Sequence, residues 1–143
     1  MAHFAATVRT EKPVDQVFSF VSDLENFAVW DPGVESSTQI SGAGPGLGSA
    51  YEVSASGAEL VYEVVEFDVP NRIVAEAKTK LLHSYDVITV EVRQGSTYVT
   101  YDATLSLNGP LAMGDIAFGV MFDKIAEKAI GGLVDALDGT RIQ

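Results

Sequence analysis

Between residues 34 and 107 the chain is built almost wholly from short segments in which apolar and polar side chains alternate. Such alternation is typical of β-strands that have one covered face and one face in water. The segments are separated by turn residues and occupy 34–40, 49–55, 58–67, 72–80, 83–93 and 97–107. Consecutive strands joined by short turns predict an antiparallel sheet, and its covered face needs a partner.

One later segment is long enough to be that partner. After Pro110, apolar side chains recur every three or four residues from Leu111 to about Leu137, and most charged side chains lie away from them. The pattern predicts an amphipathic helix with Pro110 in its first turn. Gly131-Gly132 near its end predicts either a bend or the close approach of another backbone.

A further strand and two short helices precede the sheet segments. Residues 3–10 alternate as a strand, and Pro13 opens a helical pattern that Ser22-Asp23 interrupts. Asp23 is expected to cap a second short helix, which Asp31-Pro32-Gly33 ends. The expected fold is therefore α+β: a curved antiparallel sheet of about seven strands wrapped on a long C-terminal helix.

Composition narrows the classes of function. A chain of 143 residues fits one domain, 1–143, and its net charge of −11 makes it a poor binder of nucleic acid. No segment approaches the ~20 apolar residues of a membrane-spanning helix, so no stable membrane insertion is expected. Cysteine is absent and neither histidine has a metal-ligand spacing, so we expect no metal and no cofactor. No signal peptide is recognisable, and we expect a cytoplasmic protein.

Several segments resemble the START-like (SRPBCC) superfamily, in particular its bacterial polyketide cyclase/dehydrase and lipid-transport group. The resemblance rests on 13–18, 23–32, the glycine loop that ends at Leu47-Gly48, 62–73, 95–101 and 107–111. It covers essentially the whole chain, 1–143, and implies a helix-grip fold with a pocket between the sheet and the last helix. Members of the group include lipid carriers, aromatase/cyclases and hormone-binding proteins, so the fold alone does not select a function.

The alternation assigns a set of side chains to the covered face, where they would line such a pocket. The expected ligand-binding residues are Trp30, Tyr51, Val53, Tyr62, Val64, Ala75, Ala77, Ile88, Tyr101, Phe118, Met121, Phe122 and Ile125. The alanines among them, together with Ala103, favour an open cavity. The alternative is that three large side chains of the last helix, Phe118, Met121 and Phe122, fill that space.

Asp86 is the catalytic candidate. It lies two and four residues before Ile88 and Val90, so the alternation places its carboxyl group with theirs on the covered face of the sheet. Burial there would raise the pKa of Asp86 toward values useful for proton transfer. Its position near a strand end favours a second interpretation, a carboxylate that stays in water, and we prefer that one. For Glu66 we expect an ion pair with Arg72 across the intervening turn rather than an acid/base role.

Three hypotheses for function follow. The preferred one is a protein that binds a small hydrophobic or aromatic molecule, such as a lipid, an isoprenoid or a polyketide. The second is a cyclase or dehydratase in which Asp86 or a pocket tyrosine moves protons. The third is a protein-interaction module with a filled core and no ligand. The sequence leaves the ligand and the oligomeric state, including a homodimer, open.

Overall fold

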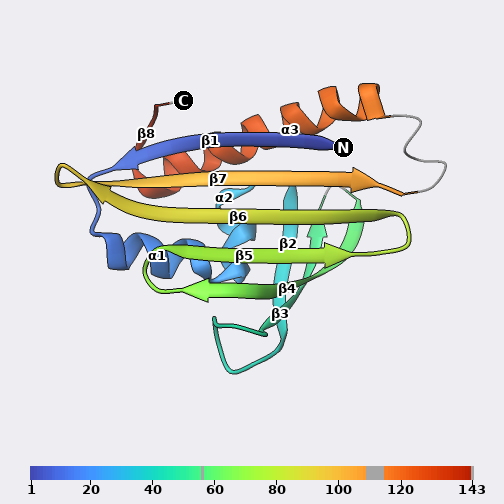
Figure 1. Ribbon diagram of the computed structural model, residues 1–143, viewed down its shortest axis with the longest axis horizontal. Coiled ribbons are helices and arrows are strands. Elements are labelled where there is room, and N and C mark those ends of the chain that lie inside the picture. Colours follow the sequence, from blue (N-terminus) through green and yellow to red (C-terminus); the bar gives the residue numbers. More distant parts are fainter. Residues whose placement is uncertain (56, 109–114, 143) are drawn as a thin grey trace.

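The alternating segments form one antiparallel sheet in the structure, a computed structural model that describes residues 1–55, 57–108 and 115–142, and only the backbone of 115–120. Its strands are β1 (Ala2–Thr10), β2 (Val34–Ser41), β3 (Ala50–Ala55), β4 (Ala58–Asp68), β5 (Arg72–Lys78), β6 (Leu82–Arg93), β7 (Ser96–Leu107) and β8 (Thr140–Arg141). Their order in the sheet is β2-β3-β4-β5-β6-β7-β1-β8 (Figure 1). The expected antiparallel meander is thereby confirmed, with β1 added beside β7.

Two strands differ from the expectation. The strand expected at 72–80 ends at Lys78, because the hydroxyl of Thr79 accepts hydrogen bonds from the backbone N–H groups of Leu81 and Leu82 and so closes the turn. The two-residue β8 pairs with Val8 and Arg9 of β1 and extends the sheet to eight strands. A strand this short has no alternation from which it could be predicted.

The helices follow the expected order: α1 (Val14–Ser22), the 3₁₀ helix η1 (Leu24–Asn26), α2 (Phe27–Trp30) and α3 (Asp115–Leu137). Asp23 caps the second helical segment as expected, since its carboxylate accepts from the backbone N–H of Glu25 at 3.1 Å. The expected start of the last helix at Leu111 lies outside the described residues.

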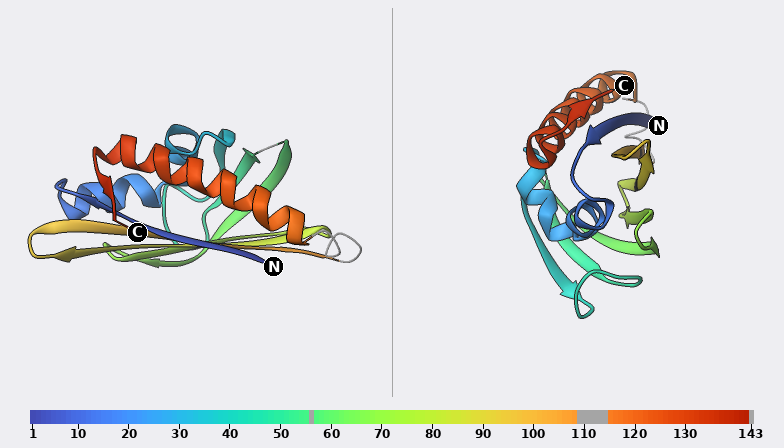
Figure 2. Two further views of the ribbon diagram at one scale, coloured as in Figure 1. Left: turned by 90° about the horizontal axis from the view of Figure 1, so that it is seen from above. Right: turned by 90° about the vertical axis from the view of Figure 1, so that its left-hand side faces the viewer.

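The sheet is bent, and all helices lie on its concave side (Figure 2). Irregular pairing between Val64 and Glu66 on β4, and at two places along β2, marks the half of the sheet that curls toward the helices. α3 packs along β1 and against α2, and it contributes Ala126, Ala129, Ile130, Leu133 and Leu137 to the core. The architecture is the expected helix-grip fold, an α+β layer of curved sheet against one long helix.

Gly132 sets how closely α3 can lie on α2. A Cβ atom built at this position would stand 1.7 Å from the backbone carbonyl oxygen of Trp30, whereas one at Gly131 would meet nothing within 4 Å. The expected close backbone approach is therefore confirmed for the second glycine of the pair. The contact fixes the position of Trp30, which is 2% exposed and lies behind the site described next.

Candidate functional site

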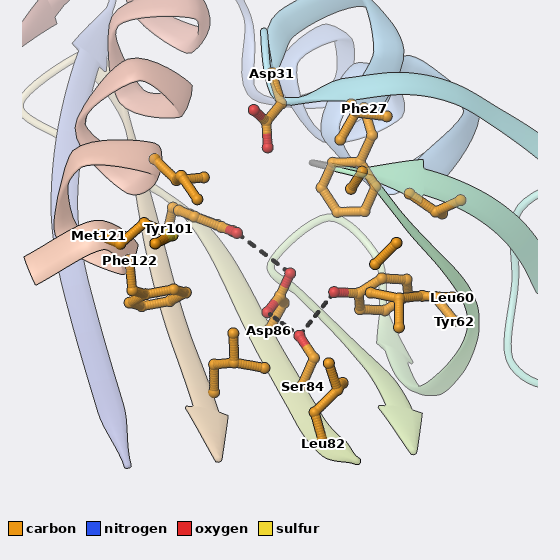
Figure 3. Close-up of a pocket in the computed structure, with 16 residues that line it drawn as sticks. Phe27, Asp31, Leu60, Tyr62, Leu82, Ser84, Asp86, Tyr101, Met121 and Phe122 are labelled. Atoms are coloured by element: carbon orange, nitrogen blue, oxygen red, sulfur yellow. Dashed lines mark hydrogen bonds between the residues drawn. The ribbon is translucent and has the colours of Figure 1, made fainter. Parts of the chain in front are cut away.

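A pocket of about 250 Å³ lies between the concave face of the sheet, α2 and the α3 side chains of Met121, Phe122 and Ile125 (Figure 3). Its walls are mainly apolar and aromatic. The lining residues are Phe27, Asp31, Val34, Val53, Ala55, Ala58, Leu60, Tyr62, Leu82, Ser84, Asp86, Tyr101, Leu105, Met121, Phe122 and Ile125. The described side chains of α3 that reach the pocket, Met121, Phe122 and Ile125, therefore border an opening here rather than filling it.

The structure divides the expected ligand-binding residues into two groups. Those that line the pocket are Val53, Tyr62, Tyr101, Met121, Phe122 and Ile125. Those that lie in the surrounding core are Trp30, Tyr51, Val64, Ala75, Ala77 and Ile88. The side chain of Phe118 lies outside the described residues. The core group shares a cluster with the buried side chains of α1, so the covered face of the sheet is partly closed by that helix.

Trp30 supports the pocket from behind. Its ring centroid lies 5.3 Å from that of Phe27 and 5.6 Å from that of Tyr101, and both of these rings face the pocket. Tilted and edge-on ring pairs at this spacing are favourable. A large, fully buried side chain thus holds two lining rings in place.

Asp86 is buried in the pocket wall, with 6% of its surface exposed. The parity assignment was right, and our preference for a solvated carboxylate was wrong. β6 begins at Leu82, so Asp86 lies well inside the strand, with direct neighbours Ala75 on β5 and Ala103 on β7. Because both neighbours are small, the carboxyl group faces the pocket without being covered by the sheet. Ala75 and Ala103 do not line the pocket themselves, but their small side chains leave the carboxyl group of Asp86 open to it.

A chain of hydroxyl groups connects Asp86 to two pocket tyrosines. The hydroxyl of Tyr101 donates to Oδ2 of Asp86 at 3.2 Å, and that of Ser84 donates to Oδ1 at 3.4 Å. The hydroxyl of Tyr62 lies 2.7 Å from Oγ of Ser84. Figure 3 shows this chain crossing the floor of the pocket between apolar side chains on either side. A continuous polar strip therefore runs along the pocket floor.

Burial shifts the acid–base behaviour of this strip. Desolvation raises the pKa of Asp86 to about 7; the negative charges of Asp31 and Asp102 add to that shift, and the donated hydrogen bonds of Tyr101 and Ser84 oppose it. Burial also raises the pKa of Tyr62 and of Tyr101 above the usual range, and the charge of Asp86 acts in the same direction on both. Near neutral pH the carboxyl group can therefore accept or release a proton, while both phenols stay protonated.

Asp31 is a pocket residue that the sequence interpretation assigned only to a turn. It follows α2 directly, and its Oδ1 accepts from the backbone N–H of Gly33 at 2.9 Å. The Asp-Pro-Gly pattern correctly predicted that turn, but the turn also directs the carboxyl group into the pocket (Figure 3). Burial raises the pKa of Asp31, and the hydrogen bond from Gly33 opposes the shift. No periodicity signals a pocket residue inside a turn.

Glu66 takes no part in the pocket. Its Oε2 lies 2.5 Å from Nε of Arg72, and both side chains are well exposed. The expected ion pair across the turn is confirmed. Among the residues that the structure describes, no cluster of three or more acidic or histidine side chains is arranged to hold a metal ion. In the same described part of the chain, no helix is long and apolar enough to cross a membrane.

A curved antiparallel sheet gripping one long helix over a mainly apolar pocket defines a START-like, helix-grip protein. The family model described as polyketide cyclase / dehydrase and lipid transport matches residues 1–138, and the chain belongs to this family. A comparison with the curated proteins finds no match.

Solved structures share the fold at low sequence identity. A START superfamily protein from Mycobacterium smegmatis is 17% identical with a TM-score of 0.68, over 96% of this chain and 94% of that one. A hypothetical protein from Helicobacter pylori is 13% identical with a TM-score of 0.75, over 94% and 87%. The di-domain ARO/CYC protein BexL is 22% identical with a TM-score of 0.69, over 94% of this chain but 49% of BexL. At these identities the likeness supports the fold alone.

Proposed function

We propose that this protein binds a small, mostly apolar molecule in the pocket between its sheet and α3. The observation that carries the proposal is the pocket itself: apolar and aromatic walls with a polar strip at Asp86 and the carboxyl group of Asp31. Sites for small molecules have this composition, because apolar walls supply affinity and a few placed polar groups orient the ligand. The third hypothesis, an interaction module with a filled core, fits the pocket less well.

The size of the pocket favours a compact ligand. Its volume of about 250 Å³ lies just below the range of about 300–1,000 Å³ that is typical of sites for drug-sized molecules. A compact ligand of one to three rings suits this space better than a long acyl chain or a large polycyclic polyketide. Met121, which is 57% exposed, borders the pocket where α3 meets solvent and so lies on the route of entry.

A titration with the neutral fluorescent dye N-phenyl-1-naphthylamine tests the proposal. We expect a saturable rise in fluorescence with one dye per chain. Phe122→Trp enlarges a lining side chain and should weaken the dye's binding about tenfold or more, because overfilling a packed site costs about 1–3 kcal/mol. The matched control is Phe20→Trp, the same change at a partly buried position of α1 outside the pocket. If the dye does not bind, or if both variants bind it like the wild type, the proposal is wrong.

A second candidate function uses the same pocket for proton transfer. A carboxyl group with a pKa near 7 is suited to general acid/base catalysis at neutral pH, and Tyr101 and Ser84 hold it in place. A cyclase or dehydratase acting on a carbonyl compound would need such a group. Once a substrate is found, Asp86→Asn should lower kcat by about a hundredfold or more. Turnover that Asp86→Asn leaves intact would remove Asp86 from the reaction.

A further inference from the structure

The polar groups of the pocket are acidic or neutral, which limits the charge of the ligand. Among the described residues that line it, Asp31 and Asp86 carry the two carboxyl groups, and none is a lysine, arginine or histidine. The charges that act on the pKa of Asp86 also come from carboxylates, Asp31 and Asp102. An anionic ligand, such as a fatty acid, would enter this pocket against like charge and without a cationic partner.

The two carboxyl groups share one space. Asp31 enters it from the turn after α2 and Asp86 from the floor formed by β6 (Figure 3). Asp86 has donors at both oxygens, whereas Oδ1 of Asp31 accepts one backbone hydrogen bond. Neither carboxyl group has an ion-pair partner among the described residues. The described residues of the pocket thus supply no positive charge that could balance the two carboxyl groups.

Aromatic rings border the same space. Phe27 and Tyr62 lie on one side of the two carboxyl groups, and Tyr101 and Phe122 on the other (Figure 3). The face of an aromatic ring attracts a cation, more strongly where water is excluded. Rings on two sides and carboxyl groups at two ends are the elements that recognise an ammonium group on an apolar molecule.

We infer that the ligand is a compact aromatic or apolar amine, bound as its ammonium ion with the charged nitrogen between Asp86 and Asp31. The inference rests on the proposed binding function and names the chemical class of the ligand. The ammonium group would donate to carboxylate oxygens, and the apolar skeleton would occupy the space between Leu60, Leu105 and Phe122.

The pH dependence of binding separates an amine from a neutral ligand. An ammonium ion needs Asp86 ionised, so its affinity should rise as pH increases through the pKa of Asp86. A carbonyl compound that accepts from a protonated Asp86 should bind more weakly over the same interval. The other titratable groups that face Asp86 are Asp31 beyond α2, Tyr62 on β4 and Tyr101 on β7, while the described α3 residues of the pocket are uncharged.

Three indole compounds of similar size and different charge provide the test: tryptamine, tryptophol and indole-3-propionate. Calorimetric titrations at about pH 6 and about pH 8 would give their dissociation constants for the wild type, Asp86→Asn, Asp31→Asn and the control Asp135→Asn, which changes an exposed carboxylate of α3. We expect tryptamine to bind at least about tenfold more tightly than tryptophol at the higher pH. The preference should shrink toward unity in Asp86→Asn, decrease in Asp31→Asn and persist in Asp135→Asn.

The outcomes separate the two proposals. If tryptophol or indole-3-propionate binds as tightly as tryptamine, or if the preference survives in both pocket variants, the amine inference is wrong and the binding function stands. If none of the three compounds and no neutral dye binds, the binding function itself is wrong. A thermal melt of each variant confirms that it is folded. The pH series on the wild type tests the inference without any substitution.

Discussion

Gly132 of α3 lies against the backbone carbonyl of Trp30, so closely that a Cβ atom at this position would stand 1.7 Å from the carbonyl oxygen. Trp30 in turn packs its ring on Phe27 and Tyr101, both of which face the pocket. The distance between α3 and α2 therefore sets the position of two pocket walls. A residue without a side chain, itself outside the pocket lining, is thus required for the shape of the site.

Gly132→Ala should destabilise the protein by more than about 3 kcal/mol, because the clash is with backbone and no rotamer change relieves it. Chemical denaturation followed by circular dichroism measures this. Gly131→Ala is the matched control, because a Cβ atom at this position has open space. Replacing this helical glycine by alanine should raise the free energy of unfolding by about 0.5–1 kcal/mol. Equal effects of the two substitutions would show that the close contact is absent.

Asp86 should make the stability of the protein depend on pH in a defined direction. Its pKa in the folded state, about 7, lies above the usual value near 4 of the unfolded chain, so the folded state holds the proton more tightly. Its contribution to stability is complete below about pH 4 and is lost as pH rises through 7. The loss is on the order of 4 kcal/mol.

Comparison with Asp86→Asn isolates this contribution. Between about pH 4 and pH 8 the free energy of unfolding of the wild type should fall relative to that of the variant, because the amide does not titrate. Urea denaturation at several pH values would measure the difference. A difference that stays constant over this interval would mean that Asp86 is not held in a desolvated site.

Tyr101 should lower the pKa of Asp86 through its hydrogen bond to Oδ2. Tyr101→Phe keeps the ring and removes the donor, so the pKa of Asp86 should rise further. The free energy of unfolding should fall by about 1–2 kcal/mol, because a hydrogen bond to the buried carboxyl group is lost. Tyr62→Phe is the matched change, since that hydroxyl reaches Ser84 rather than Asp86. Carbon-13 NMR titration of the aspartate carboxyl groups measures the pKa of Asp86 in both variants. A larger change of this pKa in Tyr62→Phe than in Tyr101→Phe would contradict the geometry.

Glu66 should contribute little to the stability of the protein and nothing to ligand binding. Its ion pair with Arg72 is exposed on both sides, and such pairs are worth about 0–1 kcal/mol. We expect Glu66→Gln to lower the free energy of unfolding by less than about 1 kcal/mol, by an amount that shrinks in high salt, and to leave dye binding unchanged. A loss of binding in this variant would reopen an acid/base role for Glu66.

The sequence predicts the fold well because each strand has one covered face. Alternation locates β3 to β7 to within a few residues and assigns Asp86, Tyr62 and Tyr101 to the correct face of the sheet. Periodicity likewise identifies α3 and the surface of it that carries Phe122 and Ile125. These features are local, and residue spacing records them directly.

The site is less predictable because it depends on which part of the covered face each helix occupies. Val64, Ala75 and Ile88 have the same parity as the pocket residues, yet they lie in the core cluster that includes α1. Asp31 and Ala58 lie in or beside turns, where alternation carries no information about direction. The cytoplasmic location and the absence of nucleic-acid binding stay predictions from the sequence, and the oligomeric state stays open.

An NMR titration of nitrogen-15-labelled protein with N-phenyl-1-naphthylamine tests most directly whether the pocket binds small apolar molecules. We expect saturable shifts of the amide signals of Val53, Ser84, Asp86 and Phe122, which line the pocket. The signals of Val61 and Val65, exposed residues of β4 outside the pocket, should stay in place. Shifts confined to such exposed residues, or no saturable shift at all, would contradict a binding function for this pocket.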